Sequence, residues 1–262
     1  MNPWDPGDYL RFGDERTRPS ADLALRIAVE RPATVIDLGC GPGNSTQVLR
    51  RRWPHACVTG LDSSVEMIEA AGEKHPDGRW VLSSIEEWSP DTLFDVVFSN
   101  AALQWLPDHG SLVERLFGHV APGGALAFQI PSTDFALVRT LIEEIALDGP
   151  WTSRMAGPLG ALTMESPGFY YDHLAPGAQS IDIWETEYFH IMDSPPAVVD
   201  WIASTGLRPF LDVLESKGES DQFVGRLHER VRESYPARRD GRVLFPFRRT
   251  FVIAYAEGHQ VG

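Results

Sequence analysis

The stretch Val35-Ile36-Asp37-Leu38-Gly39-Cys40-Gly41-Pro42-Gly43-Asn44-Ser45-Thr46 decides the fold, because it joins an apolar strand to a helix through a glycine-rich loop. Its three glycines stand at alternate positions and follow the acidic residue Asp37. Glycines allow the backbone to turn tightly and to approach a ligand where any side chain would collide. The loop therefore predicts a site for a nucleotide-like ligand.

The spacing within this loop argues against a dinucleotide. The fingerprint G-x-G-x-x-G would require a glycine at position 44, where Asn44 stands, and the third glycine comes one place early at Gly43. A carboxylate at Asp37 would repel a pyrophosphate but would suit a cationic ligand group, directly or through water. Asp62 follows Gly41 by 21 residues, the spacing at which an acidic side chain reaches ribose hydroxyls. The ligand should combine a ribose with a cation and carry no phosphate, and S-adenosylmethionine fits that description.

Hydrophobic periodicity predicts an α/β fold. Short apolar runs alternate with helical patterns, which is typical of parallel strands joined by crossover helices. We expect one domain over residues 1–262, with residues 1–30 as an N-terminal lid and the Gly/Pro-punctuated residues 148–178 as a cap insertion. The expected strands are 34–38, 56–61, 79–82, 94–99, 125–130, 180–192 and 247–255. The expected helices are 44–52, 64–74, 111–120 and 133–147.

Composition limits the classes of partner. The net charge of −14 opposes binding to nucleic acid or to an anionic membrane, because both depend on basic surface. No apolar run approaches the ~20 residues of a membrane span, and the polar, acidic N-terminus does not resemble a targeting peptide. We therefore expect a soluble, cytoplasmic protein. Cys40 and Cys57 are the two cysteines, too few for a disulfide framework, and we expect both to be free thiols.

Four segments together resemble the Rossmann-like S-adenosylmethionine-dependent methyltransferases. They are VIDLGCGPGNST at 35–46, GLDSS at 60–64, FDVVFSN at 94–100 and APGG at 121–124. The resemblance implies a seven-stranded sheet, mostly parallel with its last strand antiparallel, that carries a helical cap. It also implies that S-adenosylmethionine is the cofactor and is bound by Asp37, Gly39, Cys40, Gly41, Asp62, Ser63, Ser84, Ile85, Asn100 and Ala101.

Within this set, the resemblance assigns parts of the cofactor to particular residues. Gly39 and Gly41 would lie under the methionine part, and Asp62 would bind the ribose, while Asn100 and the residue after it would flank the methionine. Many family members carry Asp and an apolar residue after the third strand to hold the adenine, whereas this chain has Ser84-Ile85. We expect Ile85 to pack on the adenine ring and a serine hydroxyl or a neighbouring backbone group to bind its amine.

The flanking segments resemble members of the same family that esterify a carboxylate of a small tricarboxylic acid. These segments include Trp4-Asp5-Pro6, Asn100-Ala101-Ala102-Leu103-Gln104-Trp105, Gly149-Pro150-Trp151 and Pro246-Phe247-Arg248-Arg249. The resemblance implies a small tricarboxylate substrate, and the planar fork of arginine suits carboxylates best. The candidate substrate-binding residues are Tyr9, Arg16, Arg18, Gln104, Trp105, Trp151, Arg248 and Arg249.

Carboxylate methylation would need no catalytic residue. A carboxylate is already ionised at neutral pH, so no general base is required, and no His/Asp or Cys/His constellation suggests one. The arginines Arg248 and Arg249 should point to opposite faces of the last strand, so at most one of them is expected to meet the substrate. The histidines show no metal-ligand spacing, so we expect no metal site.

Three alternatives stay open. The same cofactor could serve another small acid or a hydroxylated metabolite. A nicotinamide-dependent oxidoreductase would need tight binding of a dinucleotide, against which Asp37 and Asn44 argue. A non-catalytic S-adenosylmethionine-binding module would use its aromatic and arginine-rich cap as an interaction surface. No oligomeric state is predicted.

Overall fold

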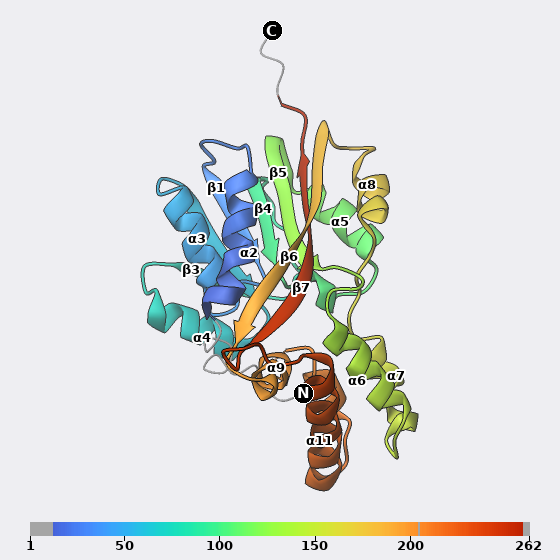
Figure 1. Cartoon of the computed structure of the whole chain (residues 1–262). Helices are drawn as coiled ribbons and strands as arrows, with labels where there is room; N and C mark the ends of the chain where they lie inside the picture. The colour runs from blue at the N-terminus through green and yellow to red at the C-terminus, as the bar shows by residue number, and fades with distance from the viewer. Residues whose placement is uncertain (1–12, 204, 259–262) are drawn as a thin grey trace. The chain divides into compact units, whose positions relative to one another are not determined.

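The structure, a computed structural model, describes residues 13–203 and 205–258, with side chains from Thr17 onward (Figure 1). The described residues divide into two compact units. The first, here called the sheet unit, comprises the residues up to Thr133, Thr163–Thr186 and the residues from Thr250. The second, the helical unit, comprises Asp134–Leu162 and Glu187–Arg249. The expected cap at 148–178 is thus shared between the two units.

Seven strands form one sheet in the order β3-β2-β1-β4-β5-β7-β6. The pairs β1–β2, β1–β4, β2–β3 and β4–β5 are parallel. The end of β7 lies beside the starts of both its neighbours, because Ala256 donates its N–H to the Gly124 carbonyl and Gln179 donates to the Tyr255 carbonyl. β7 is therefore antiparallel, as expected. The strands are β1 (Thr34–Leu38), β2 (Cys57–Asp62), β3 (Arg79–Leu82), β4 (Phe94–Asn100), β5 (Val120–Pro131), β6 (Ser180–Met192) and β7 (Val243–Tyr255).

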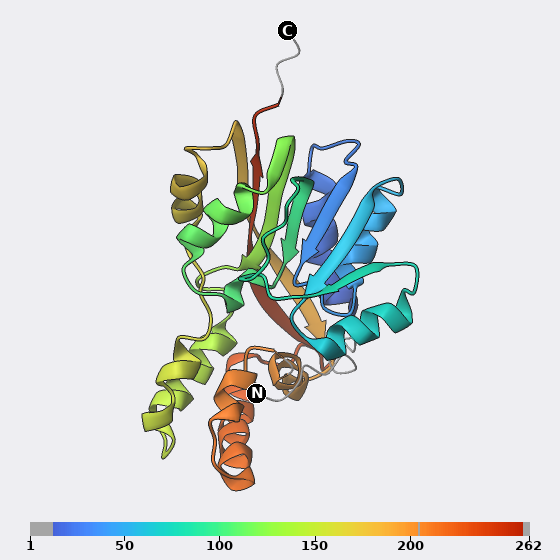
Figure 2. The same cartoon turned by 180° about the vertical axis from the view of Figure 1, so that it is seen from behind.

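Helices cover both faces of the sheet in the sheet unit. Helices α2 (Gly13–Arg26) and α3 (Asn44–Arg52) lie on the face seen in Figure 1, and α5 (His109–Phe117) and α8 (Pro167–Leu174) lie on the face seen in Figure 2. Buried side chains of α5 and α8 pack on the sheet in one apolar cluster. The remaining elements of this unit are α4 (Val65–Lys74) and the short helix η1 (Leu103–Trp105).

The helical unit has its own apolar core. Its largest fully buried side chains include Trp151, Phe210, Phe223 and Phe245, and the Trp151 and Phe223 rings lie 5.1 Å apart. Among the residues that the structure describes, no helix of either unit is long and apolar enough to span a membrane. The helices of this unit are α6 (Leu137–Leu147), η2 (Thr152–Arg154), α7 (Ala156–Leu159), α9 (Pro195–Ala203), α10 (Arg208–Asp212) and α11 (Lys217–Ser234).

The largest boundary differences are at the starts of β5, α6 and β7, which begin at Val120, Leu137 and Val243 instead of residues 125, 133 and 247. The segment Ala121-Pro122-Gly123-Gly124, which precedes the expected strand 125–130, lies inside β5, because a register shift between Phe94 and Val96 of β4 accommodates the extra residues as a bulge. The helix expected from residue 133 begins at Leu137, because a turn at Thr133 and Asp134 comes first, Ala136 is extended, and the Phe135 carbonyl accepts the N–H of Arg248 on β7. The expected strands 34–38, 79–82 and 180–192 and the helix 44–52 have the expected bounds.

The strand order reverses between β1 and β4, and this places the candidate site. In open α/β sheets, ligands bind outside the carboxyl ends of the strands at such a switch point. Leu38 at the end of β1 pairs with Ser99 near the end of β4. The loop after β1 and the segment after β4 therefore begin side by side.

Candidate functional site

The glycine loop between β1 and α3 adopts the backbone that its sequence predicts. Gly39, Gly41 and Gly43 have φ of 72°, 53° and 87°, in the left-handed region that other residues rarely adopt. A Cβ on Gly39 would lie 2.3 Å from the Cβ of Ala102, and one on Gly43 would lie 2.7 Å from the Trp80 ring. A Cβ on Gly41 would meet no atom within 4 Å. Two of the glycines thus allow close packing, while the third faces open space where a ligand could approach.

Asp37 is fully buried behind this loop. Its Oδ2 accepts hydrogen bonds from the hydroxyls of Ser45 at 2.7 Å and Thr46 at 2.6 Å, which ties β1 to the first turn of α3. Its Oδ1 is buried and has no hydrogen-bond partner. Burial raises the pKa of Asp37 to about 6, although the two hydroxyls oppose the shift. A buried, incompletely paired carboxylate suits a nearby cation.

Asp62, at the end of β2, holds the glycine loop from the other side. Its Oδ2 accepts the N–H of Gly41 at 2.8 Å, and its Oδ1 accepts the N–H of Ser64 at 2.9 Å. Burial raises the pKa of Asp62, and these N–H groups oppose the shift. Each carboxylate oxygen keeps a further lone pair, so ribose hydroxyls could still donate to Asp62. The expected neighbour Ser63 is exposed beside it.

The segment after β4 is held in an unusual conformation. Ala101 has φ of 54°, which costs a non-glycine residue about 1 kcal/mol or more. Its N–H donates to the Gln129 carbonyl at 2.9 Å, and its carbonyl accepts from Nε2 of Gln104 at 2.8 Å. The side-chain Oδ1 of Asn100 is buried without a hydrogen-bond partner. The structure thus presents an acceptor at Asn100 that a ligand donor could satisfy.

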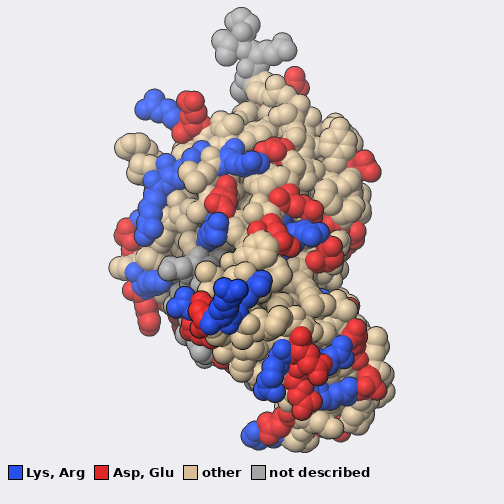
Figure 3. Space-filling view, viewed as in Figure 1, with Lys and Arg blue, Asp and Glu red and all other residues tan. Residues whose placement is uncertain are grey.

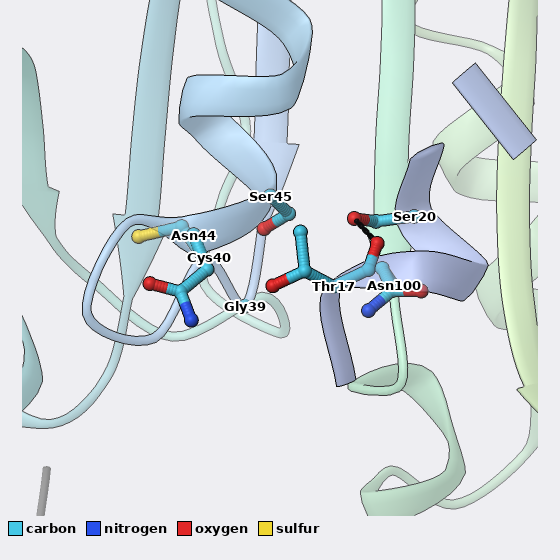
Figure 4. A pocket seen from close by; sticks show the side chains of 7 residues that line it. All are labelled: Thr17, Ser20, Gly39, Cys40, Asn44, Ser45 and Asn100. Atoms are coloured by element: carbon cyan, nitrogen blue, oxygen red, sulfur yellow. Dashed lines mark hydrogen bonds between the residues drawn. The ribbon is translucent and has the colours of Figure 1, made fainter. Parts of the chain in front are cut away.

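A pocket lies where these segments meet helix α2 (Figure 4). Of the residues expected to bind the cofactor, Gly39, Cys40 and Asn100 line it. The sequence interpretation missed its other lining residues, which are Thr17, Ser20, Asn44 and Ser45. Asn44 and Ser45 could have been found, because the first turn of a helix after a glycine loop presents free N–H groups. Thr17 and Ser20 carry no recognisable motif, and only folding brings α2 to the loop.

The expected adenine residues lie just beyond β3. Ile85 is buried in the core of the sheet unit, and its carbonyl accepts from the Arg115 guanidinium at 2.9 Å. Ser84 is half-buried, and its hydroxyl accepts the N–H of Glu87 at 3.1 Å. The Ser84 hydroxyl therefore helps to order its own turn, and its expected role toward the adenine amine stays a prediction.

Among the expected substrate residues in the sheet unit, Gln104 is buried, Trp105 is half-buried and Arg18 is exposed. Gln104 accepts the N–H of Thr163 through its main-chain carbonyl at 2.8 Å. Tyr9 lies outside the described residues, as does the side chain of Arg16.

Three expected substrate residues belong to the helical unit. Trp151 is fully buried, and its indole N–H donates to the Ile145 carbonyl at 2.9 Å, so this ring serves the core and presents no free face to a ligand. Arg248 pairs with Asp134 at 3.1 Å and lies 3.9 Å from a Glu187 oxygen. Arg249 is only 4 % exposed, and its guanidinium lies 4.5 Å from the Phe247 ring centroid.

The donor set of the sheet unit fits S-adenosylmethionine. The open space at Gly41 leaves room for a ligand. The unpaired Oδ1 of Asp37 suits a cationic group of the ligand, and the unpaired Oδ1 of Asn100 suits a hydrogen-bond donor. Among the described residues, no group of histidine, cysteine and acidic side chains could hold a metal ion. On the face shown in Figure 3, basic and acidic side chains are interspersed rather than gathered in one broad basic surface.

Comparison with known proteins agrees with this geometry. Residues 12–167 match the family described as a methyltransferase domain. The chain is 42 % identical to the trans-aconitate 2-methyltransferase of Azoarcus sp. over 97 % of its length and 99 % of the relative's. It is 45 % identical to that of Methylobacterium radiotolerans, covering 97 % of this chain and 98 % of the relative.

A solved structure supports the fold. The YcgJ protein from Bacillus subtilis superposes with a TM-score of 0.59 at 13 % identity, covering 92 % of this chain and 99 % of that one. The expected Rossmann-like methyltransferase fold is confirmed, and so is the resemblance of the flanking segments. The chain therefore belongs to the methyltransferase family that includes the trans-aconitate 2-methyltransferases.

Proposed function

We propose that this protein transfers a methyl group from S-adenosylmethionine to a carboxylate of trans-aconitate, giving the monomethyl ester and S-adenosylhomocysteine. The observation that carries the proposal is the sequence identity of 42 % and 45 % to two trans-aconitate 2-methyltransferases over nearly the whole chain. The predicted cytoplasmic location and the tricarboxylate class of the substrate belong to the same proposal.

The sheet unit supplies the residues that would hold the cofactor. The loop at Gly39 and Gly41 and the acceptor at Asn100 would take the methionine part, with Asp62 on the ribose. Asp37 would favour the cationic part electrostatically, because it is buried beside the loop and one of its oxygens has no partner. When bound, S-adenosylmethionine supplies a methyl carbon that is electrophilic because it is attached to a sulfonium.

The proposed reaction requires no proton transfer by the protein. A substrate carboxylate is ionised at neutral pH, so its oxygen can form the new O–C bond while the C–S bond breaks and its electron pair stays on sulfur. No proton has to move. The residues would therefore act by holding the two reactants in line and by excluding water, which can supply much of the rate enhancement.

Buried titratable groups agree with a mechanism that has no general base. Cys40 lines the pocket, but burial raises the pKa of its thiol far above the neutral range, and Asp37 and Asp62 add to the shift. The thiolate is the reactive form, so Cys40 is not placed to act as a nucleophile. Its small size between two glycines is a sufficient reason for its presence.

The test is a methyl-transfer assay with purified protein and methyl-labelled S-adenosylmethionine. Trans-aconitate, cis-aconitate, citrate and isocitrate are offered in parallel, and base-labile labelled ester is measured. We expect the highest kcat/KM with trans-aconitate. If another acid is esterified preferentially, that acid is the substrate, and the proposed type of reaction still holds. Binding of S-adenosylhomocysteine without transfer to any acid would refute the proposed reaction and favour a hydroxylated acceptor or a binding module.

A further inference from the structure

His109 and Tyr170 form a buried polar pair within the sheet unit. His109 begins α5 and Tyr170 lies in α8, and their side chains are 2 % and 0 % exposed. Nε2 of His109 lies 2.9 Å from the Leu103 carbonyl, which can only accept, so Nε2 carries the proton. Nδ1 of the neutral ring then accepts the O–H of Tyr170 at 2.5 Å. One tautomer therefore satisfies both contacts.

This pair connects two segments that are distant in the sequence. On one side it reaches Leu103, the first residue of η1. On the other side the Tyr170 hydroxyl accepts the N–H of Glu165 at 3.3 Å. A second link joins the same two segments, because Thr163 donates its N–H to the Gln104 carbonyl at 2.8 Å. The segment after β4 is thus tied to the segment 163–170 at two points.

The segment held in this way borders the cofactor pocket. Asn100 lines the pocket, and the strained Ala101 follows directly. A residue with positive φ keeps that conformation only when its surroundings hold it. Gln104 contributes by bonding the Ala101 carbonyl, and Gln104 is itself fixed by its place in η1. The contacts of η1 therefore decide how firmly Asn100 is placed.

We propose that His109 and Tyr170 are positioning residues that hold the segment from Asn100 to Trp105 against the cofactor pocket through the Leu103 carbonyl. The inference rests on the proposed function and deepens it. Neither side chain lines the pocket, so both would act through the segment after β4. Both residues also pack in the core, where the Tyr170 ring lies 5.1 Å from that of Phe128. A test must separate this packing from the polar link.

The chain offers a matched control. His173 of α8 and Glu114 of α5 form a second link between the same two helices, with Nδ1 and Oε1 2.6 Å apart. This link is at the surface and joins one residue of α8 to one residue of α5. His173→Gln therefore perturbs the contact between α5 and α8 without touching the Leu103 carbonyl.

The experiment compares Tyr170→Phe, His109→Leu, His109→Gln and His173→Gln with the unmodified chain. The dissociation constant of S-adenosylhomocysteine is measured by titration calorimetry, kcat and KM by methyl transfer, and the unfolding midpoint by calorimetry. We expect His109→Leu and Tyr170→Phe to weaken S-adenosylhomocysteine binding about fivefold, the effect of one hydrogen bond of ordinary strength. His109→Gln keeps a donor for the Leu103 carbonyl and should restore most of the affinity, and His173→Gln should match the unmodified chain.

Two results would overturn the proposal. In the first, His109→Leu lowers the unfolding midpoint but leaves the dissociation constant unchanged, which would make the role one of core packing. In the second, His173→Gln weakens binding as much as Tyr170→Phe, which would make the contact between helices the cause. If the unmodified chain esterifies no acid, the proposed function fails, and the S-adenosylhomocysteine titrations still decide the role of the pair.

Discussion

Gly39 and Ala102 approach so closely that a Cβ on Gly39 would lie 2.3 Å from the Cβ of Ala102. This contact joins the loop after β1 to the segment after β4, on the two sides of the switch point in the sheet. Gly39 also has φ of 72°, so both its backbone and its surroundings require glycine. The contact brings together two of the segments that line the pocket, which α2 also lines.

Replacing Gly39 by alanine should destabilise the protein. The new methyl group would collide with Ala102 in a packed region and would strain the backbone, and together these effects should cost about 3 kcal/mol. The free energy of unfolding in urea measures the change. A variant as stable as the unmodified chain would show that the two segments separate easily.

Replacing Gly41 by alanine should affect binding rather than folding. Its Cβ would meet no atom within 4 Å, so the expected cost to stability is about 1 kcal/mol from the positive φ alone. The methyl group would project into the space that the ligand is proposed to use. We expect binding of S-adenosylhomocysteine to weaken at least about tenfold, measured by titration calorimetry. Unchanged affinity would place the ligand elsewhere.

The buried carboxylate of Asp37 should make stability depend on pH. Burial raises the pKa of Asp37 from 3.8 to about 6, so between these values the folded state binds more protons than the unfolded state. The contribution of Asp37 to stability is complete below pH 3.8 and is lost as the pH rises through 6. The shift corresponds to about 3 kcal/mol.

Asp37→Asn isolates this effect. The neutral amide does not titrate, so the stability of the variant relative to the unmodified chain should rise by up to about 3 kcal/mol between acid and neutral pH. Urea unfolding at a series of pH values measures the difference. A difference that does not change with pH would mean that Asp37 titrates alike in the folded and unfolded states.

The two arginines of β7 should differ in their effect on the substrate. Arg248 is already paired with Asp134 and lies near Glu187, so a carboxylate would have to compete for it. Because neighbouring residues of a strand point to opposite faces, at most one of the two arginines should face the substrate, and we predict that Arg249→Ala raises the KM for trans-aconitate about tenfold, the effect of losing hydrogen bonds to a charged group. Arg248→Ala should change it about threefold or less.

Steady-state kinetics with varied trans-aconitate at saturating S-adenosylmethionine tests both arginines. Arg249→Lys keeps the charge but loses the planar fork, so its KM should lie between that of the unmodified chain and that of Arg249→Ala. An unchanged dissociation constant for S-adenosylhomocysteine would confirm that the variants remain folded. A larger effect at position 248 than at 249 would reverse the assignment.

The thiol of Cys40 should resist alkylation. Its burial raises the pKa of the thiol and leaves little thiolate, whereas Cys57 is partly exposed. In mildly alkaline buffer, iodoacetamide should modify Cys57 first, and both cysteines should react after denaturation. Mass spectrometry of the peptides measures each site. Rapid labelling of Cys40 in the folded protein would show that the loop opens readily.

The local pattern was enough to predict most elements. β1, β3, β6 and α3 have the expected bounds, because apolar alternation and glycine punctuation act over a few residues. The start of β5 was missed, because the bulge that takes in its Pro-Gly-Gly sequence depends on pairing with β4. The division of the chain into two units was also not visible, because the boundary at Leu162 and Thr163 depends on which surfaces pack together.

In the candidate site, too, some features follow from the sequence and others depend on tertiary packing. The positive φ of Gly39 and Gly41 and the placement of Asp62 beside the loop follow from spacing that the sequence carries. By contrast, Trp151 was expected at a pocket and is a core residue, because the aromatic partner that covers it comes from α11. Aromatic residues at loops and in cores look alike until their neighbours are known.

By itself the sequence determined the glycine loop, the acidic residues at the ends of β1 and β2, the α/β order and the membership in a methyltransferase family. These features depend on residue type and short spacing. Only the tertiary structure decided that Thr17 and Ser20 line the pocket, that Arg248 is paired with carboxylates, and that His109 and Tyr170 reach the segment after β4. The physical reason is that hydrogen bonds and ion pairs between distant segments depend on how the elements pack, which no local pattern records.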